Sequence, residues 1–170
     1  MRKLARRLAV LLCSVCLFSL FGCSSAISQP AVEPILNFQA KANVTMDKNQ
    51  YVCNLDYSAE QGAQLTLLVP QELEGMSWSW DKRVISIAYE GLTVAQDSTV
   101  LPDTGIIPLL LESLDAAAVP NALTTSGDGL FFGSTQGHNF TITVDRRSGQ
   151  VKQLDIPERG FKAIFEPLSE

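Results

Sequence analysis

Apolar and polar side chains alternate along most of the chain after residue 36. Between residues 38 and 46 every second side chain is apolar, and each side chain between them is polar. A period of two residues is typical of a β-strand that buries one face and exposes the other to solvent. Similar runs occupy residues 51–57, 63–69, 76–80, 85–89, 130–132, 140–144, 151–156 and 161–165, with residues 92–94 as a candidate short edge. The pattern predicts eight or nine strands.

Short polar turns separate these runs. Residues 47–50, 148–149 and 158–160 combine charged or polar side chains with Gly149 and Gly160 in the last two turns. Such connections are too short for a crossover between parallel strands, so neighbouring strands should pair antiparallel. The expected arrangement is a β-meander.

One segment has a different period. Between residues 106 and 118, apolar side chains recur at helical spacing, as at Ile107, Leu110, Leu111 and Leu114. Thr104 or its neighbour Asp103 could cap the helix start, and a proline two residues beyond residue 118 should end it. A helix this apolar needs an apolar surface to cover.

The combination predicts a mainly β, α+β domain. Strands with a single apolar face and one apolar helix fit a curved antiparallel sheet, or half-barrel, with the helix on its concave face. Residues 36–170 suit one domain with one core. The stretch 23–35 is small and polar with two prolines, and is expected to be a flexible tether.

The first 22 residues are expected to be a secretory signal. Four basic side chains precede residue 8, and an apolar run extends to Phe21, which is shorter than the roughly 20 residues of a membrane-spanning helix. The sequence Leu-Phe-Gly-Cys ending at Cys23 resembles the bacterial lipobox. This resemblance implies cleavage before Cys23, lipidation of its thiol and attachment to the extracytoplasmic face of the cell membrane. An ordinary signal peptide or an uncleaved anchor is the alternative.

Removing the signal changes the charge balance. All 18 acidic residues follow residue 32, whereas four of the 13 basic residues lie before residue 8. The mature chain would carry a strong negative charge, which disfavours nucleic acid as a partner. Of the four cysteines only Cys53 would remain free, so an internal disulfide or a cysteine metal site is not expected.

The sequence contains few residues that could form a catalytic or metal site. His138 is the one histidine of the chain and is expected to be an exposed turn residue, with no nucleophile motif around it. Cys53 is expected to be a buried core thiol. The sequence predicts no catalytic residues, no metal site and no cofactor, and favours a protein that is not an enzyme.

The segments 38–57, 69–92 and 141–165 together resemble the lipoprotein-carrier family of LolA and LolB, as found in lipid-anchored proteins of clostridia and their relatives. The middle segment contains Val69-Pro70-Gln71 leading into Trp78-Ser79-Trp80. The resemblance implies an incomplete β-barrel with helices filling its mouth and an interior that takes acyl chains. The chain departs from the family in lacking an N-terminal helix and an arginine between Glu33 and Lys82, so no binding residue is carried over.

Two functions follow as hypotheses. The first is a lipid-anchored envelope protein whose half-barrel binds an apolar ligand such as an acyl chain. Its expected walls and lid are Tyr51, Leu65, Leu67, Trp78, Trp80, Ile87, Leu110, Leu111, Leu114, Phe140 and Ile142. The second is a solid-cored interaction module that binds an envelope protein partner or forms a homodimer through an edge strand. Trp78 and Trp80 fit either reading, as cavity wall or as core.

Overall fold

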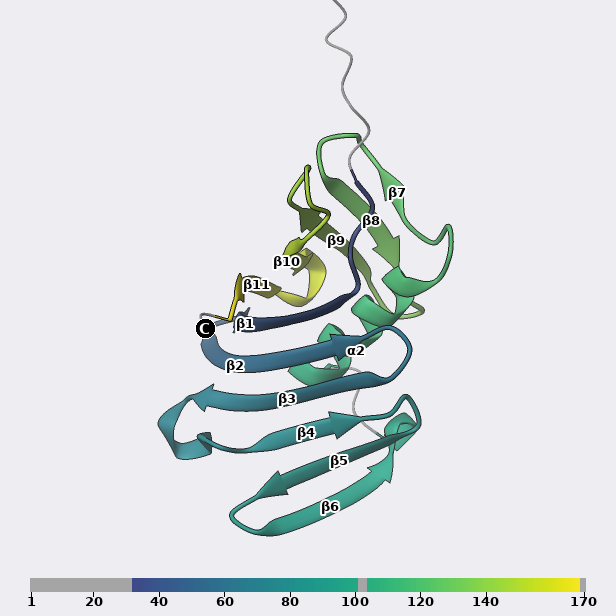
Figure 1. The fold of residues 1–170 in the computed structure, drawn as a ribbon. Helices are drawn as coiled ribbons and strands as arrows, with labels where there is room; N and C mark the ends of the chain where they lie inside the picture. Colours follow the sequence, from purple (N-terminus) through teal and green to yellow (C-terminus); the bar gives the residue numbers. More distant parts are fainter. Residues whose placement is uncertain (1–31, 101–103, 169–170) are drawn as a thin grey trace, which may run out of the picture.

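The computed structural model describes residues 32–100 and 104–168. In these ranges the chain forms one antiparallel sheet of 11 strands and one α-helix (Figure 1). The strands are β1 (Asn37–Met46), β2 (Asn49–Ser58), β3 (Gly62–Val69), β4 (Ser77–Trp80), β5 (Val84–Tyr89), β6 (Leu92–Asp97), β7 (Thr124–Thr125), β8 (Leu130–Ser134), β9 (Asn139–Val144), β10 (Val151–Ile156) and β11 (Phe161–Pro167). The helix is α2 (Ile106–Ala118), and three short 3-10 turns are η1 (Gln71–Leu73), η2 (Ser98–Val100) and η3 (Pro157–Arg159).

Two meanders meet at the middle of the sheet. The strand order is β6-β5-β4-β3-β2-β1-β11-β10-β9-β8-β7, so the first and last strands of the fold are neighbours. In that seam Ala42 pairs with Phe165 and Val44 with Ala163. The sheet is open, because β6 and β7 stand at its two ends and do not pair with each other.

The predicted fold class is confirmed at the level of a mainly β domain with an antiparallel sheet and a helix. The count of eight or nine strands is too low. Strand β7 contains two exposed residues and carries no alternation, and β6 reaches Asp97 with every residue exposed. A strand that buries neither face leaves no period of two in the sequence.

Helix α2 covers residues 106–118 as expected. Its N-cap residue is Gly105, and no side chain caps the first turn, so the proposed cap by Thr104 is wrong; Asp103 lies outside the described residues. Val119 adopts an extended conformation before the proline at position 120, which ends the helix as predicted.

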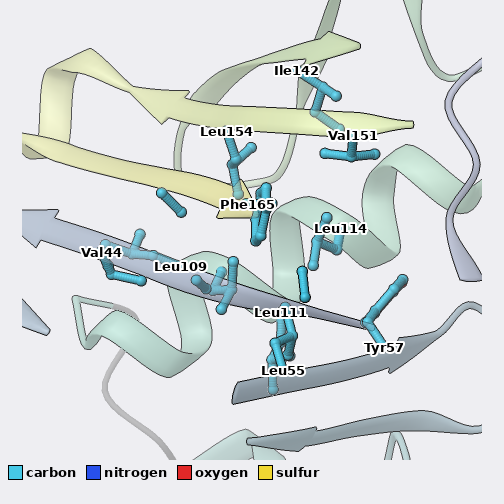
Figure 2. Packing of buried hydrophobic residues seen from close by; sticks show 14 of the residues in the cluster. Val44, Leu55, Tyr57, Leu109, Leu111, Leu114, Ile142, Val151, Leu154 and Phe165 are labelled. Carbon is cyan, nitrogen blue, oxygen red and sulfur yellow. The ribbon is translucent and has the colours of Figure 1, made fainter. Parts of the chain in front are cut away.

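The helix joins the two halves of the sheet into one core. Leu109, Leu110 and Leu114 are almost fully buried and belong to the same cluster as Leu55 of β2 and Leu154 of β10. Figure 2 shows Leu109 and Leu114 of the helix between Leu55 of one meander and Leu154 of the other. Burying one leucine side chain stabilises the fold by about 1.5–3 kcal/mol. The leucines of α2 therefore favour a sheet that bends around the helix.

The amino-terminal segment joins the domain at Ile35. The backbone N–H of Ile35 donates to the carbonyl of Gly149 at 2.9 Å, and Ile35 forms a parallel bridge with Gln150. Ile35 is therefore tied to the loop between β9 and β10, two residues before β1 begins. The predicted signal peptide, Cys23 and the tether as far as residue 31 lie outside the described residues.

Candidate functional site: an apolar pocket under the start of α2

A pocket of about 290 Å³ lies between the first turn of α2 and strands β1 to β4. Ile106 and Ile107 of the helix stand on one side of it. The sheet and the β3–β4 connection supply the rest of the lining: Val44, Met46, Tyr51, Cys53, Leu65, Leu67, Leu73, Met76 and Trp78.

Strand alternation explains why these side chains share one face. In the register Val44 pairs with Tyr51, Cys53 with Leu67, and Leu65 with Trp78. Residues opposite one another in an antiparallel pair point to the same side of the sheet. The four strands therefore present a continuous apolar surface toward α2.

The pocket has a buried floor and a half-exposed rim. Val44, Cys53, Leu65 and Leu67 are each at most 5% exposed and form the floor. The rim residues, including Met76, are half-buried.

Backbone hydrogen bonds hold the β3–β4 part of the rim in place. The N–H of Leu67 donates to Met76 O, and the N–H of Gly75 donates to Leu67 O, both at 2.9 Å. The Tyr89 hydroxyl donates to Glu72 O at 2.6 Å. These bonds tie η1 and the start of β4 to the neighbouring strands, so this wall is preformed.

The walls carry no formal charge. No lining residue is ionised at neutral pH, because burial raises the pKa of the Cys53 thiol to about 12. The thiol donates to the Ala42 carbonyl oxygen at 3.8 Å. A charged ligand group placed among such walls would lose its hydration without compensation, so the pocket suits hydrocarbon.

The structure brings together four of the residues expected to bind a ligand, namely Tyr51, Leu65, Leu67 and Trp78. The expected lid residues Leu110 and Leu114 are fully buried in the core. The helix meets the pocket through Ile106 and Ile107 instead. Sequence reasoning grouped the helical residues by their spacing, which identifies a buried stripe but not which turn of the helix stands beside a cavity.

The remaining expected site residues are spread over the sheet. Trp80 and Leu111 line a separate hollow of about 190 Å³, and Phe140 lines one of about 570 Å³ near β7 to β9. Ile142 is fully buried in the core, and Ile87 pairs with Trp78 beyond the pocket. Besides Ile106 and Ile107, the sequence analysis did not select five lining residues: Val44, Met46, Cys53, Leu73 and Met76. All but Leu73 stand in phase with apolar strand residues that it did select.

His138 is a buried residue, so its expected position in an exposed turn is wrong. Its side chain is 6% exposed and lies between the β8–β9 turn and the middle of α2. The ring atom Nε2 is 2.9 Å from Ser113 Oγ, and Nδ1 is 3.1 Å from Thr135 Oγ1. The sequence contains the turn but not the helix that covers it, which is why the burial was not foreseen.

The hydrogen bonds around His138 hold its ring from both sides. Ser113 Oγ donates to Leu109 O at 2.7 Å, so it accepts from Nε2–H. Thr135 Oγ1 accepts the backbone N–H groups of Gly137 and His138, each at 3.2 Å. The Thr135 hydroxyl donates to His138 O at 3.3 Å and lies 3.1 Å from Nδ1, so these two acceptors share its hydrogen.

The surroundings of His138 favour the neutral ring. Its pKa lies below the usual value for histidine, first because burial penalises the charged form and then because Arg159 is nearby; Glu158 acts in the opposite direction. The Ser113–His138 pair does not form a nucleophilic site, since Ser113 is fully buried and its hydroxyl is committed to Leu109.

Two further observations concern the described ranges 32–100 and 104–168. No three His, Cys, Asp or Glu side chains in them come together as a metal site would require. None of their helices is long and apolar enough to cross a membrane.

Comparison with models of known protein families finds none that matches this chain. Comparison with curated proteins finds no match either.

Proposed function

We propose that this chain is a lipid-anchored protein of the cell envelope whose LolA/LolB-like half-barrel binds an apolar ligand, such as an acyl chain, in the pocket under α2. The observation that carries the proposal is a preformed pocket with uncharged, almost wholly apolar walls beside an open sheet. Its volume of about 290 Å³ is at the lower end of the range for small-molecule sites, about 300–1,000 Å³. A single chain suits this space better than a lipid with several chains.

Mass spectrometry of the soluble mature chain tests ligand binding. Residues 24–170 contain every contact of the described fold, so this fragment retains the sheet and α2. Native and denaturing spectra of the purified protein should differ by the mass of a bound lipid on a monomer. Protein that remains empty after incubation with fatty acids and lysophospholipids would overturn the proposal.

A matched pair of variants locates the ligand. Met76→Trp adds bulk at the rim of the pocket and should abolish lipid retention. Ser79→Trp adds the same side chain to an exposed position of β4, where the strand alternation turns it to the opposite face, and should leave retention unchanged. Equal retention in the two variants would place the lipid elsewhere.

Anchoring has its own test. In bacteria fed a labelled fatty acid, the full chain should become labelled and sediment with membranes. Cys23→Ala should remove both properties, whereas Cys53→Ala should keep them, because Cys53 is buried in the folded domain. Labelling that survives Cys23→Ala would contradict the lipobox interpretation.

A second function, as an interaction module, is favoured by strand β6. All six of its residues are exposed, and Leu92 and Val94 are 75% and 55% exposed at the end of the sheet. Val94 pairs with Ile87 on the face that also carries Trp78. An unpaired strand with apolar side chains is a template for adding another strand.

Two lysine variants of β6 test this alternative. The native mass spectrum should show a dimer without bound lipid. Val94→Lys should dissociate this dimer, whereas Thr93→Lys, on the opposite face of the strand, should leave it intact.

A further inference from the structure

We propose that the outer face of the sheet carries a second binding site, for a neutral sugar, in the hollow of about 570 Å³ over β8 and β9. We call this site the outer hollow. It shares no lining residue with the pocket under α2, so the inference goes beyond the proposed function. Its volume lies within the range for small-molecule sites, about 300–1,000 Å³.

Strand alternation turns five side chains of β7, β8 and β9 to the same side of the sheet. In the register Phe132 pairs with Thr124 and Thr141, and Ser134 pairs with Asn139. Residues opposite one another in an antiparallel pair point to one side. Every second residue of β9 is buried in the core, and Asn139 and Thr141 are the residues between. The group therefore faces outward, away from the core and α2.

Phe132 supplies an apolar platform in the outer hollow. Its side chain is 43% exposed, and no other Phe, Tyr or Trp side chain in residues 32–100 and 104–168 is exposed. One face of a sugar ring consists of C–H groups, so it can cover an aromatic ring while the hydroxyl groups stay at the rim. An aromatic ring that is half-open inside a hollow gains free energy when such a face covers it.

Polar groups surround this platform. The hydroxyls of Thr124, Ser134 and Thr141, the amide of Asn139 and the carboxylate of Glu158 all belong to residues that line the outer hollow. Hydroxyls and amides both donate and accept hydrogen bonds, which matches the many hydroxyl groups of a sugar. The same groups would lose their hydration against a hydrocarbon chain, so an acyl ligand is not favoured here.

The Glu158 carboxylate is fixed in position and sets the charge of the outer hollow. Its Oε1 accepts the backbone N–H of Asn139 at 2.6 Å. A carboxylate has about four acceptor positions, so others can accept sugar hydroxyls. Among the described residues of the lining, Glu158 is the only charged one. An anionic ligand would meet this negative charge without a cation to pair with, so the site favours a neutral sugar.

An extended peptide fits this place less well. A peptide that joins a sheet needs a run of unpaired edge strand. Strand β7 covers β8 at Phe131 and Phe132, and β7 itself is two residues long. The edge is therefore a short template, whereas the outer hollow lies over side chains of the outer face.

Amide NMR spectra of the isotope-labelled chain of residues 24–170 test the site. The chain is titrated with maltotriose and chitotriose, which are neutral sugar oligomers, and with trigalacturonate, which is anionic. A neutral oligomer should shift the amide signals of β7, β8, β9 and η3 and leave those of β1 to β4 in place, whereas trigalacturonate should shift none. The proposal would be overturned if neither neutral oligomer shifted these signals, if trigalacturonate bound equally well, or if only a proline-rich peptide bound.

Phe132→Ser and Ile164→Ser form a matched pair. Ile164 is 40% exposed on the outer face of β11 and does not line the outer hollow. Phe132→Ser should weaken binding of the neutral oligomer about fivefold to tenfold, because the exposed half of the aromatic ring is no longer available to be covered. Ile164→Ser should leave the affinity unchanged, and an equal loss in both variants would contradict the site.

A second pair tests the polar contacts. Thr141 and Thr143 are both half-buried on the outer face of β9, but only Thr141 lines the outer hollow. Thr141→Val should weaken binding about twofold to tenfold, the scale of one hydrogen bond, whereas Thr143→Val should not. Urea denaturation shows whether each variant is folded. No lipid is used, so failure of these tests leaves the pocket under α2 unaffected, and an empty pocket leaves the outer hollow unaffected.

Discussion

At the scale of single residues, the clearest feature is a buried tyrosine hydroxyl without a partner. Tyr57 is 1% exposed, and its hydroxyl has no hydrogen-bond partner among residues 32–100 and 104–168. Burial and the nearby Asp115 both raise the pKa of Tyr57, so the hydroxyl remains protonated. Its aromatic ring contributes packing against Phe38, with ring centroids 6.0 Å apart.

We therefore expect Tyr57→Phe to raise the free energy of unfolding by about 1 kcal/mol, because it removes a polar group that pays for its desolvation without a bond in return. Tyr57→Ala should lower it by about 3–5 kcal/mol through loss of the ring. Urea denaturation measures both. A destabilised Tyr57→Phe protein would mean that the hydroxyl has a partner in solution, such as a water molecule.

His138 predicts the direction of a pH effect on stability. Its pKa in the folded protein lies below the value of about 6.5 expected in the unfolded chain. Above that pH both states hold the neutral ring and stability is complete. As the pH falls below about 6.5, the unfolded chain binds a proton that the folded chain resists, so stability decreases until the pH passes the folded pKa.

The measurement is the urea midpoint between pH 7.5 and pH 5.5 for the wild type and His138→Gln. The wild-type midpoint should fall more on acidification than that of the variant, and the difference between the two isolates the histidine from the carboxylates. Parallel curves would show that His138 does not contribute.

At the scale of elements, α2 has two roles along its length. Leu109, Leu110 and Leu114 fill the core, whereas Ile106 and Ile107 at its first turn stand beside the pocket and are half-buried. The apolar side chains in the middle of the helix therefore pack in the core, whereas those at its start line the pocket. Leu111, which is 6% exposed, belongs with the core residues, so Leu111→Asp should chiefly unfold the domain.

Two aspartate substitutions separate these roles. Ile107→Asp should leave the domain folded, because residue 107 is partly exposed and an acidic side chain is favourable in a first helical turn, but it should abolish lipid binding. Leu110→Asp buries a charge in the core and should unfold the protein. Circular dichroism and native mass spectrometry report folding and lipid together. A folded Ile107→Asp protein that still carries lipid would remove the helix start from the binding site.

The strands and the helix differ in how well the sequence predicted them. Strand β1 and helix α2 were predicted with nearly their observed bounds, because each buries one face and leaves the other polar. Strand β7 was not predicted because neither of its residues is buried. The burial of His138 was missed for a related reason, since a turn covered by a distant helix has the same local sequence as an exposed turn.

At the scale of the whole molecule, the seam between β1 and β11 makes one sheet of two meanders. Val44 faces Ala163, and Met46 faces Phe161, across a pairing that joins the start and the end of the fold. The helix lies on the face that both meanders share (Figure 1), and its leucines contact both. This arrangement leaves part of the β1 to β4 surface uncovered beyond the first helical turn, and the pocket occupies that space.

The sequence by itself determined the helix, the strands that bury one face, and which face of each is apolar, because those properties follow from spacing along the chain. The lipoprotein signal over residues 1–22, with lipidation of Cys23, stays a prediction from the sequence. Only the tertiary structure decided that β1 pairs with β11 and joins the two meanders into one open sheet, that α2 covers His138, and that a cavity remains beside Ile106 and Ile107. Those features depend on contacts between segments far apart in the chain and on how completely side chains fill the space between them, which no local pattern records.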